Sequence, residues 1–385
     1  MKKRLIIVTE LIAPYRIPVF NALTLRDEID LQVIFLAEND PTLRQWLVYK
    51  GEIRFPYQVL PSWRPRLGKH KLLLNRGLSA ALDRVAPNAI LCGGYNYLAS
   101  WLAKFWARRN QVTFLLWVES TAKDLRSNRA LIESVKTRFM RSCDAFVVPG
   151  KSSFEYLRRY DTPQEKIFAA PNAVATEFFA RLSEAVRTDD AIHRGKLDLP
   201  SRFFLFVGRL VPEKGVFDLL HAYGTLAPQV RAELGLVLVG DGMARSELER
   251  RAAGISPGAI RIPGFVQRDQ LAHYYALAEM LVFPTHSDPW GLVVNEAMAC
   301  GLPVISTDAA GCTADLIEDH WNGRVVRAGD ISQLASAMQD LASDSDLRSL
   351  MSRNTLQHIL RYSPEAWATG ISHAVFLSAG VSRHE

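Results

Sequence analysis

Two carboxylates stand eight positions apart in a segment that is otherwise nearly apolar. Asp288 lies in the turn "DPWG", and Glu296 follows inside the run "LVVNEAMACG". A carboxylate within an apolar helix is costly unless a partner satisfies it. Hydroxyl groups of a ligand could serve as that partner, while the free amide hydrogens at the helix start, near Gly291 and Leu292, could bind a phosphate. The spacing therefore indicates a site for a hydroxylated, phosphate-bearing ligand.

Two cations occupy a second junction between a strand and a helix. In "FLFVGRLVPEKGVFDLLHAY" (204–223), Arg209 and Lys214 follow a glycine turn at Gly208. Guanidinium and ammonium groups neutralise phosphate oxygens, and the helix start adds a partial positive charge, so this junction suits a diphosphate. The alternative is a pair of solvated charges on a loop. The residues by themselves leave both interpretations open.

Three other motifs fail the test of a known cofactor site. The Gly-x-Gly in "LVLVGDGMARS" has Arg245 where a dinucleotide-binding turn has its third glycine, so it predicts a tight turn that lets backbone approach a ligand. The string "GKSS" lacks the earlier glycine of a phosphate-binding loop, since that position is Ala145. Asp344-Ser345-Asp346 follows a helical pattern and predicts a capping turn. We expect no metal and no cofactor.

Short apolar strands alternate with helical patterns along the chain. Near-continuous apolar strands of this kind predict parallel sheets covered by helices on both faces, an α/β fold. Two series indicate two doubly wound, Rossmann-like lobes, whose ligands bind beyond the carboxyl ends of the strands, in a cleft where the lobes face each other. The expected strands are 4–9, 31–36, 89–92, 112–118, 145–150 and 166–171, then 203–208, 236–241, 260–264, 280–285, 303–307 and 323–328.

The length of 385 residues exceeds what one hydrophobic core usually serves. We expect a first lobe over 1–180, a polar and weakly periodic linker over 181–202, and a second lobe over 203–362. A late helix in 363–385 is expected to pack back on the first lobe.

Charge is divided unevenly between the two halves. Residues 1–180 contain 27 Lys and Arg against 16 Asp and Glu, whereas residues 181–385 contain 19 against 24. A basic lobe favours an anionic partner such as nucleic acid, anionic lipid or a phosphorylated substrate; ordinary surface scatter is the alternative. The aromatic and basic run "WLAKFWARRNQ" (101–111) suits a membrane surface. It equally suits a core helix with a basic outer end.

The compartment follows from the cysteines and the N-terminus. The four cysteines have no metal or redox spacing, which is typical of a reducing cytoplasm. The start "MKKRLIIVTE" predicts a buried strand and not a signal peptide, because its apolar run ends at Glu10. We expect a cytoplasmic protein, with peripheral contact at the inner face of the membrane as a further hypothesis.

Together these motifs resemble the retaining, nucleotide-sugar-dependent glycosyltransferases of family four. Their hallmark is an acid, seven residues and a glutamate, here Asp288, "PWGLVVN" and Glu296. The motifs "PNAVATEFF", "VGRLVPEKG", "VGDG" and "IPGFV" occur in the family's order within 165–330, and "IAPYRIPVFNAL" (12–23) matches more loosely. This sequence has Asp where the family more often has Glu. The resemblance implies the GT-B fold, two Rossmann-like lobes facing each other across a cleft.

The resemblance also implies roles for the second lobe. Glu296 would accept hydrogen bonds from ribose hydroxyls, and Asp288 would contact the transferred sugar. Arg209 and Lys214 would neutralise the diphosphate as its bond to the sugar breaks, assisted by the amides at Gly291 and Leu292. The implied donor-binding set is Gly208, Arg209, Lys214, Val266 (lining the base), Asp288, Trp290, Gly291, Leu292 and Glu296. A metal is not needed, because protein cations do its task.

The first lobe offers fewer candidates. Glu119 follows the strand at 112–118, where the family often has a histidine, and could contact the acceptor or handle a proton. Its alternative is a salt bridge with a base such as Lys123. Tyr15 and Arg16, after the first strand, are candidate donor or acceptor contacts.

The predicted function is that of a hexosyltransferase. It would move a sugar from a UDP- or GDP-activated donor, with retention, to a hydroxyl of a glycan or lipid-linked acceptor in cell-surface polysaccharide or glycolipid assembly. No nucleic acid partner is expected. The alternatives are a two-lobed nucleotide-sugar epimerase and a nucleotide-sugar sensor without turnover. A sensor does not need the leaving-group cations Arg209 and Lys214.

Overall fold

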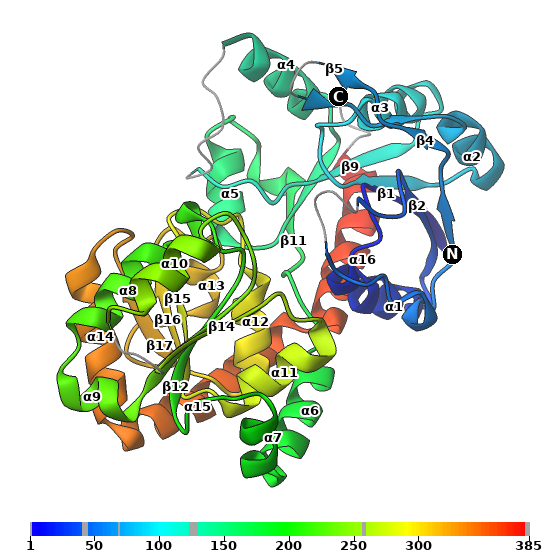
Figure 1. The fold of residues 1–385 in the computed structure, drawn as a ribbon. Helices are drawn as coiled ribbons and strands as arrows, with labels where there is room; N and C mark the ends of the chain where they lie inside the picture. The colour runs from blue at the N-terminus through cyan, green and yellow to red at the C-terminus, as the bar shows by residue number, and fades with distance from the viewer. Residues whose placement is uncertain (1, 41–44, 68–69, 123–129, 256–258, 382–385) are drawn as a thin grey trace. The chain divides into compact units, whose positions relative to one another are not determined.

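A computed structural model describes residues 2–40, 45–67, 70–122, 130–255 and 259–381. The chain forms two compact units (Figure 1). Unit 1 contains Met1–Val174 and Ser363–Glu385, and unit 2 contains Ala175–Tyr362.

Unit 1 is built on a seven-stranded sheet in which every pair of neighbours is parallel. The strand order is β11-β10-β9-β8-β1-β2-β3. The first strand of the chain, β1, is therefore internal. The next two strands in this sheet, β2 and β3, extend from it toward one edge, and β8 to β11 extend toward the other edge. The strands are β1 (Lys3–Thr9), β2 (Ile29–Phe35), β3 (Tyr57–Val59), β8 (Ala89–Cys92), β9 (Thr113–Trp117), β10 (Ala145–Val148) and β11 (Ile167–Ala169).

Side chains of these strands alternate between two hydrophobic cores, one on each face of the sheet. Leu5 and Ile7 of β1 belong to the core that includes α1 (Ile17–Thr24) and α16 (Pro364–Val381). Ile6 and Val8 belong to the other core. That second core is covered by α2 (Leu78–Val85), α3 (Leu98–Arg109), α4 (Ala130–Arg141) and α5 (Lys151–Arg158).

The last helix, α16, is an integral part of unit 1. Its Trp367 is fully buried, with ring centroids 5.7 Å from Phe20 and 5.3 Å from Trp117. At Gly370 a Cβ atom would lie 2.3 Å from the carbonyl oxygen of Ala169, so only glycine permits this approach. Figure 1 shows α16 beside α1, which joins the two ends of the sequence in one core.

Unit 2 contains a six-stranded parallel sheet with the order β14-β13-β12-β15-β16-β17. This is the doubly wound Rossmann order, in which the connections reverse direction between β12 and β15. The strands are β12 (Phe203–Val207), β13 (Gly235–Val239), β14 (Ile260–Gly264), β15 (Met280–Phe283), β16 (Val304–Thr307) and β17 (Gly323–Val326).

Helices cover both faces of the second sheet (Figure 1). On one side α8 (Val216–Thr225) and α14 (Ile331–Ser343) pack together, and on the other lie α11 (Arg268–Leu277) and α12 (Leu292–Ala299). Further helices of this unit are α9 (Pro228–Glu233), α10 (Arg245–Ala252), α13 (Thr313–Leu316) and α15 (Ser345–Ile359). Asp344 caps α15, because its carboxylate accepts a hydrogen bond from the Leu347 amide at 2.8 Å.

The stretch 181–202, expected to be a linker, differs in the structure. It contains most of α6 (Thr176–Thr188) and all of α7 (Asp190–Lys196), and both helices belong to unit 2. Arg187 donates hydrogen bonds to the carbonyls of Ala276 (3.0 Å) and Cys300 (2.6 Å). Arg194 donates to the carbonyl of Leu277 at 2.9 Å. These carbonyls lie at the ends of α11 and α12, where backbone carbonyls lack partners within the helix. Arg187 and Arg194 therefore anchor α6 and α7 to the rest of unit 2.

All twelve predicted strands are present, and the predicted ends differ from the observed ones by at most two residues. The sequence reading missed β3 and two short antiparallel pairs, β4 (Ser62–Trp63) with β7 (Leu74–Asn75) and β5 (Arg66–Leu67) with β6 (His70–Lys71). Within the described ranges, no helix has both the length and the apolar character required to cross a bilayer.

Candidate active site

The loops that follow β12 and β15 lie at the point where the strand order of unit 2 reverses. Open parallel sheets bind ligands there, beyond the carboxyl ends of the strands. The loop after β12 carries Arg209 and Lys214, and the loop after β15 carries Asp288. The two polar segments selected from the sequence therefore follow neighbouring strands.

Glycines bring these loops into close contact with one another. A Cβ atom at Gly215 would lie 1.9 Å from the carbonyl oxygen of Pro284, and its φ of +67° is the left-handed region that favours glycine. A Cβ atom at Gly240 would lie 1.8 Å from the carbonyl oxygen of Gly208. The "VGDG" turn was expected to let backbone approach a ligand. In the structure, Gly240 serves the packing of the chain against its own neighbouring loop.

Lys214 and Asp288 form an ion pair within this site. The Nζ atom of Lys214 lies 2.6 Å from Oδ2 of Asp288 and also donates to the carbonyl of Ser287 at 3.1 Å. The other oxygen of Asp288, Oδ1, accepts the amide hydrogen of Trp290 at 3.0 Å. One oxygen of the carboxylate thus holds the loop in place, and the other holds a largely buried ammonium group. An anionic ligand could compete for that ammonium group.

Arg209 presents a second positive charge. Its guanidinium group is exposed and has no hydrogen-bond or ion-pair partner in the described part of the chain. Guanidinium groups of this kind bind phosphate oxygens in pairs. The residue is therefore available to an anion at the mouth of the site.

The start of α12 supplies amide donors. Gly291 caps this helix with a φ of +101°, and the amides of Gly291 and Leu292 have no acceptor among the described residues. Such unpaired amides, together with the partial positive charge of a helix start, favour an anion. With Lys214 and Arg209 they provide the donor types that a diphosphate requires.

Trp290, predicted to contact the donor, is a scaffold residue in this structure. Its side chain is only 4% exposed, and its indole N–H donates to Oδ1 of Asn295 at 2.8 Å. Its carbonyl accepts the amide hydrogen of Cys312 at 3.1 Å. The indole therefore ties the loop after β15 to α12, and it holds Asp288 and Gly291 in position.

Glu296 has a protein partner that sequence reasoning missed. The hydroxyl of Tyr275, on α11, donates to Oε2 of Glu296 at 2.7 Å. Burial raises the pKa of Glu296 to about 7, although the Tyr275 hydrogen bond and the charge of Arg268 act in the opposite direction. Oε1 accepts no hydrogen bond from the described residues. One oxygen is thus oriented by the protein, and the other can accept from a ligand.

Loops after β13 and β14 add apolar surface to the same end of the sheet. Val266 is half-buried, while Phe265 beside it is exposed. Met243, in the loop after β13, is also exposed, and sequence reasoning had not selected it. Exposed apolar side chains at this position could cover the face of a planar base.

In unit 1, Glu119 and Arg16 form an ion pair in which both oxygens of the carboxylate take part. One terminal nitrogen of Arg16 lies 2.7 Å from Oε1 and 2.8 Å from Oε2 of Glu119. The side-chain amide of Asn172 donates to Oε1 of Glu119 at 2.8 Å, and its oxygen Oδ1 accepts from Arg16 at 3.3 Å. Both oxygens of Glu119 are therefore engaged. The partner considered from the sequence, Lys123, lies outside the described residues.

Aromatic rings surround this ion pair. The guanidinium carbon of Arg16 lies 3.9 Å from the ring centroid of Trp117, which stacks the cation on the end of β9. Tyr15 packs edge-on against Trp46, with ring centroids 5.8 Å apart. Sequence reasoning selected Tyr15, Arg16 and Glu119 but missed Asn172 and Trp117. The ion pair connects residues 103 positions apart, so no local pattern reveals it.

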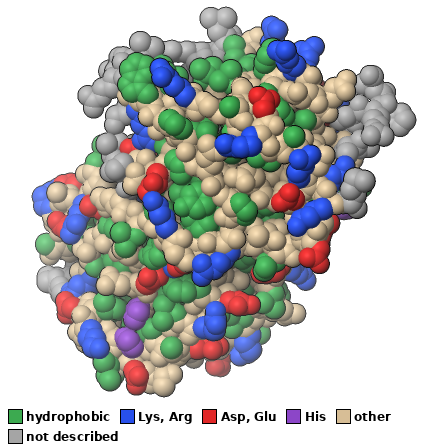
Figure 2. All heavy atoms as spheres, turned by 90° about the vertical axis from the view of Figure 1, so that its right-hand side faces the viewer, with side chains coloured by type: hydrophobic (Ala, Val, Ile, Leu, Met, Phe, Trp, Pro, Cys, Tyr) green, Lys and Arg blue, Asp and Glu red, His purple; other side chains and the backbone are tan. Residues whose placement is uncertain are grey.

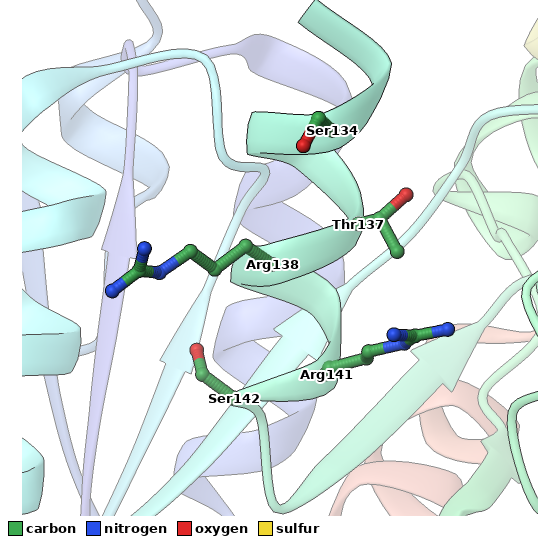
Figure 3. A pocket seen from close by; sticks show the side chains of 5 residues that line it. All are labelled: Ser134, Thr137, Arg138, Arg141 and Ser142. Carbon is green, nitrogen blue, oxygen red and sulfur yellow. The ribbon is translucent and has the colours of Figure 1, made fainter. Parts of the chain in front are cut away.

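A hollow of about 470 Å³ lies along α4 of unit 1. Its lining residues are Ser134, Thr137, Arg138, Arg141 and Ser142. Arg138 and Arg141 point to opposite sides of the helix (Figure 3). No residue predicted from the sequence lines this hollow.

Known proteins resemble this chain both in sequence and in structure. Residues 189–358 match the family model "Glycosyl transferases group 1". Alpha-D-kanosaminyltransferase of Streptomyces kanamyceticus is 30% identical over 202 residues, which are 52% of this chain and 51% of that protein. The chain spans about half the length of the curated relatives it matches first.

Solved structures resemble nearly the whole chain. Anabaena HepE in complex with UDP has a TM-score of 0.75 at 17% identity, covering 98% of this chain and 100% of that one. Sucrose-phosphate synthase from Thermosynechococcus elongatus has a TM-score of 0.74 at 20% identity, covering 99% and 100%. The two parallel sheets described above agree with this likeness. The chain has the GT-B fold.

The predicted residues are divided between the two units of this GT-B chain. Those assigned to the donor, from Gly208 to Glu296, all lie within the matched segment 189–358. Tyr15, Arg16 and Glu119 lie outside it, in unit 1. In the described parts of the chain, no group of three or more His, Cys, Asp or Glu side chains could hold a metal ion.

Proposed function

We propose that this chain is a hexosyltransferase that moves a sugar from a UDP- or GDP-activated donor to a hydroxyl of a glycan or lipid-linked acceptor. The observation that carries the proposal is the arrangement around the β12–β15 switch point. Lys214, Arg209 and the amides of Gly291 and Leu292 supply donors for a diphosphate, and Asp288 and Glu296 supply acceptors for hydroxyls. Retention of configuration, and a role in cell-surface polysaccharide or glycolipid assembly, are part of the proposal and rest on the resemblance to family four.

The named relatives favour a transferase over an epimerase or a sensor. Those found first are an alpha-D-kanosaminyltransferase and D-inositol 3-phosphate glycosyltransferases. Structures of Anabaena HepE contain UDP and UDP-glucose. These names support a nucleotide-sugar donor, and of the two bases considered they favour uracil.

The site geometry yields a mechanism for departure of the nucleotide. When the pyrophosphate binds, its oxygens compete with Asp288 for the ammonium group of Lys214. As the bond between the sugar carbon and the phosphate oxygen breaks, negative charge grows on that oxygen. Lys214, Arg209 and the α12 amides stabilise this charge, and donors held in place before the reaction are effective because they need not reorganise. Asp288, released from Lys214, can then accept a hydrogen bond from a hydroxyl of the sugar.

Glu296 and Tyr275 are proposed to hold the ribose. With Oε2 oriented by the Tyr275 hydroxyl, Oε1 of an ionised Glu296 can accept from a ribose hydroxyl. Val266, Phe265 and Met243 would line the base.

The ion pair in unit 1 is proposed to serve the acceptor. Glu119 is held through both oxygens by Arg16 and Asn172, so it is poorly placed to remove a proton. We assign it to the positioning of Arg16, with Tyr15 alongside. Unit 1 would then bind the acceptor and unit 2 the donor. The four free, buried cysteines support a cytoplasmic site for the reaction.

The proposal is tested by incubating the full chain with UDP-glucose, UDP-galactose and GDP-mannose, with and without EDTA. We expect slow release of the nucleoside diphosphate from one donor, unchanged by EDTA because protein cations stabilise the leaving group. Release should be lost in Lys214→Ala and retained in Lys196→Ala, which removes an exposed lysine of the same unit. Interconversion of the two UDP-hexoses would identify an epimerase, and binding without turnover would identify a sensor.

A further inference from the structure

In helix α3 of unit 1, the fully buried apolar residues are small, and several large apolar residues are exposed. The face buried in the core is formed by alanines, Ala99, Ala103 and Ala107. Three large apolar side chains point outward, since Leu98 is 56% exposed, Leu102 42% and Phe105 68%. The two tryptophans of the helix, Trp101 and Trp106, pack half-buried against the core. A helix that only covers a sheet normally buries its large apolar residues. This helix instead leaves three large apolar side chains exposed to its surroundings.

The outward residues form one continuous line. Positions 98, 102, 105 and 109 are separated by four, three and four residues, so they share one face of the helix. Leu98, Leu102, Phe105 and Arg109 define what we call the α3 stripe. Exposed Leu residues scattered singly need no explanation, but an aligned set of three large side chains marks an interaction surface.

Two tryptophans flank the α3 stripe. Trp101 and Trp106 are both half-buried, and their indole N–H groups donate to the Tyr95 carbonyl at 3.2 Å and to the Asp83 carboxylate at 2.7 Å. The adjoining strand pair β4–β7 adds Trp63, which is 69% exposed. Tryptophan is enriched where apolar lipid meets water.

Positive charge lies at the C-terminal end of the α3 stripe. Arg108 and Arg109 end the helix, are exposed, and have no side-chain partner in the described part of the chain. The helix contains no acidic residue, and Lys104 pairs with Asp144 at 3.6 Å. On the face of the molecule that Figure 2 presents, Lys and Arg side chains lie among hydrophobic and acidic ones.

We infer that the α3 stripe docks unit 1 on an anionic lipid surface. Leu98, Leu102 and Phe105 would enter the boundary between headgroups and acyl chains, and Arg108 and Arg109 would contact lipid phosphates. A second copy of this chain fits less well, because α3 has no acidic residue with which the exposed Arg108 and Arg109 of another copy could pair. The inference goes beyond the proposed transferase activity, since docking requires no nucleotide sugar.

The test is flotation of the full chain with vesicles, in the absence of any nucleotide sugar. Vesicles of phosphatidylcholine with 30% phosphatidylglycerol are compared with pure phosphatidylcholine, at low and high salt. We expect binding to the anionic vesicles that weakens with salt. The triple variant L98S/L102S/F105S should lower the bound-to-free ratio by roughly tenfold or more, because each exposed apolar side chain contributes to insertion.

Matched variants separate the stripe from general effects. Leu25→Ser changes an exposed leucine elsewhere in unit 1 and should leave binding unchanged. The variant R108Q/R109Q should weaken binding to anionic vesicles more than R158Q/R159Q, which removes two neighbouring arginines of α5 and its end. Far-ultraviolet circular dichroism and the melting temperature check that each variant folds.

Three results would overturn the inference. The first is no binding of the wild-type chain to anionic vesicles at low salt. The second is equal binding by the wild type and L98S/L102S/F105S. The third is a wild-type dimer in solution that the same triple variant converts to a monomer, because the stripe would then be covered by a second copy. Donor hydrolysis by the triple variant, measured without vesicles, reports on the proposed function separately.

Discussion

Lys214 is a largely buried cation that Asp288 and the Ser287 carbonyl keep in place before any ligand arrives. This arrangement matters because a buried ammonium group without a partner is costly. Asp288 therefore has two tasks in the proposed cycle. It stabilises Lys214 in the free protein and accepts a sugar hydroxyl once the pyrophosphate has taken Lys214.

Lys214→Ala is expected to lower kcat about 10²- to 10³-fold, since it removes a donor that stabilises charge on the leaving oxygen. The change in KM should be smaller. Steady-state kinetics of donor hydrolysis measure both constants. A variant with unchanged kcat and only weaker binding would contradict the leaving-group role.

Glu296 should impose a pH dependence on donor binding. Its pKa is raised to about 7, so it is ionised above that pH and becomes protonated below it. Because ribose binding uses the ionised carboxylate, donor affinity should fall as pH decreases below about 7 and level off above it. Calorimetric titration with UDP between pH 5.5 and 8.5 measures this. Glu296→Gln should bind more weakly and show a flat profile, and a wild-type profile that is itself flat would refute the role.

The contribution of the Glu296 carboxyl group to stability has the opposite dependence on pH, because it falls as pH rises. Between its ordinary value of 4.5 and about 7, the folded protein binds the proton more tightly than the unfolded chain does, so the contribution of Glu296 to the free energy of unfolding falls as pH rises through this window. Glu296→Gln should therefore be more stable than the wild type at pH 8, by roughly 1–3 kcal/mol, and this advantage should shrink by pH 5. Melting temperatures at the two pH values test it.

At the level of elements, the sequence predicted the strands well because each buried strand is a short apolar run bounded by turn residues. It missed β3, which contributes only the polar-centred segment Tyr57–Val59 to the edge of the sheet. It mistook α6 for a linker because the buried face of that helix contains Phe179, Ser183 and Val186, a weak apolar pattern. The anchoring role of Arg187 and Arg194 depends on carbonyls about 80–110 positions away.

Arg194→Ala tests whether α7 is an anchored part of unit 2. Arg194 pairs with Asp190 and donates to the carbonyls of Pro200 and Leu277. Loss of these charge-assisted bonds should cost about 2 kcal/mol. Arg181→Ala, which removes an exposed pair with Glu177 on α6, should cost much less. Differential scanning calorimetry measures both, and equal melting temperatures for the two variants would indicate a flexible linker.

At the level of the whole molecule, the two units repeat one plan. In each, the first strand is internal to a parallel sheet and the polar candidates follow the carboxyl ends of strands. Sequence motifs located the candidate residues, because turn glycines and charged loops are local features. They could not show the Lys214–Asp288 and Arg16–Glu119 pairs or the burial of Trp290, since these depend on which distant loops the topology brings together.

We expect the diphosphate to bind at the β12–β15 switch point. A crystal structure of the chain in complex with a UDP-hexose would show where the phosphates lie. We predict that phosphate oxygens accept hydrogen bonds from Lys214 and from the amides of Gly291 and Leu292, that the Lys214–Asp288 ion pair is open, and that Glu296 contacts the ribose. A diphosphate bound elsewhere, or an intact Lys214–Asp288 pair with no phosphate at the start of α12, would rule out this binding site.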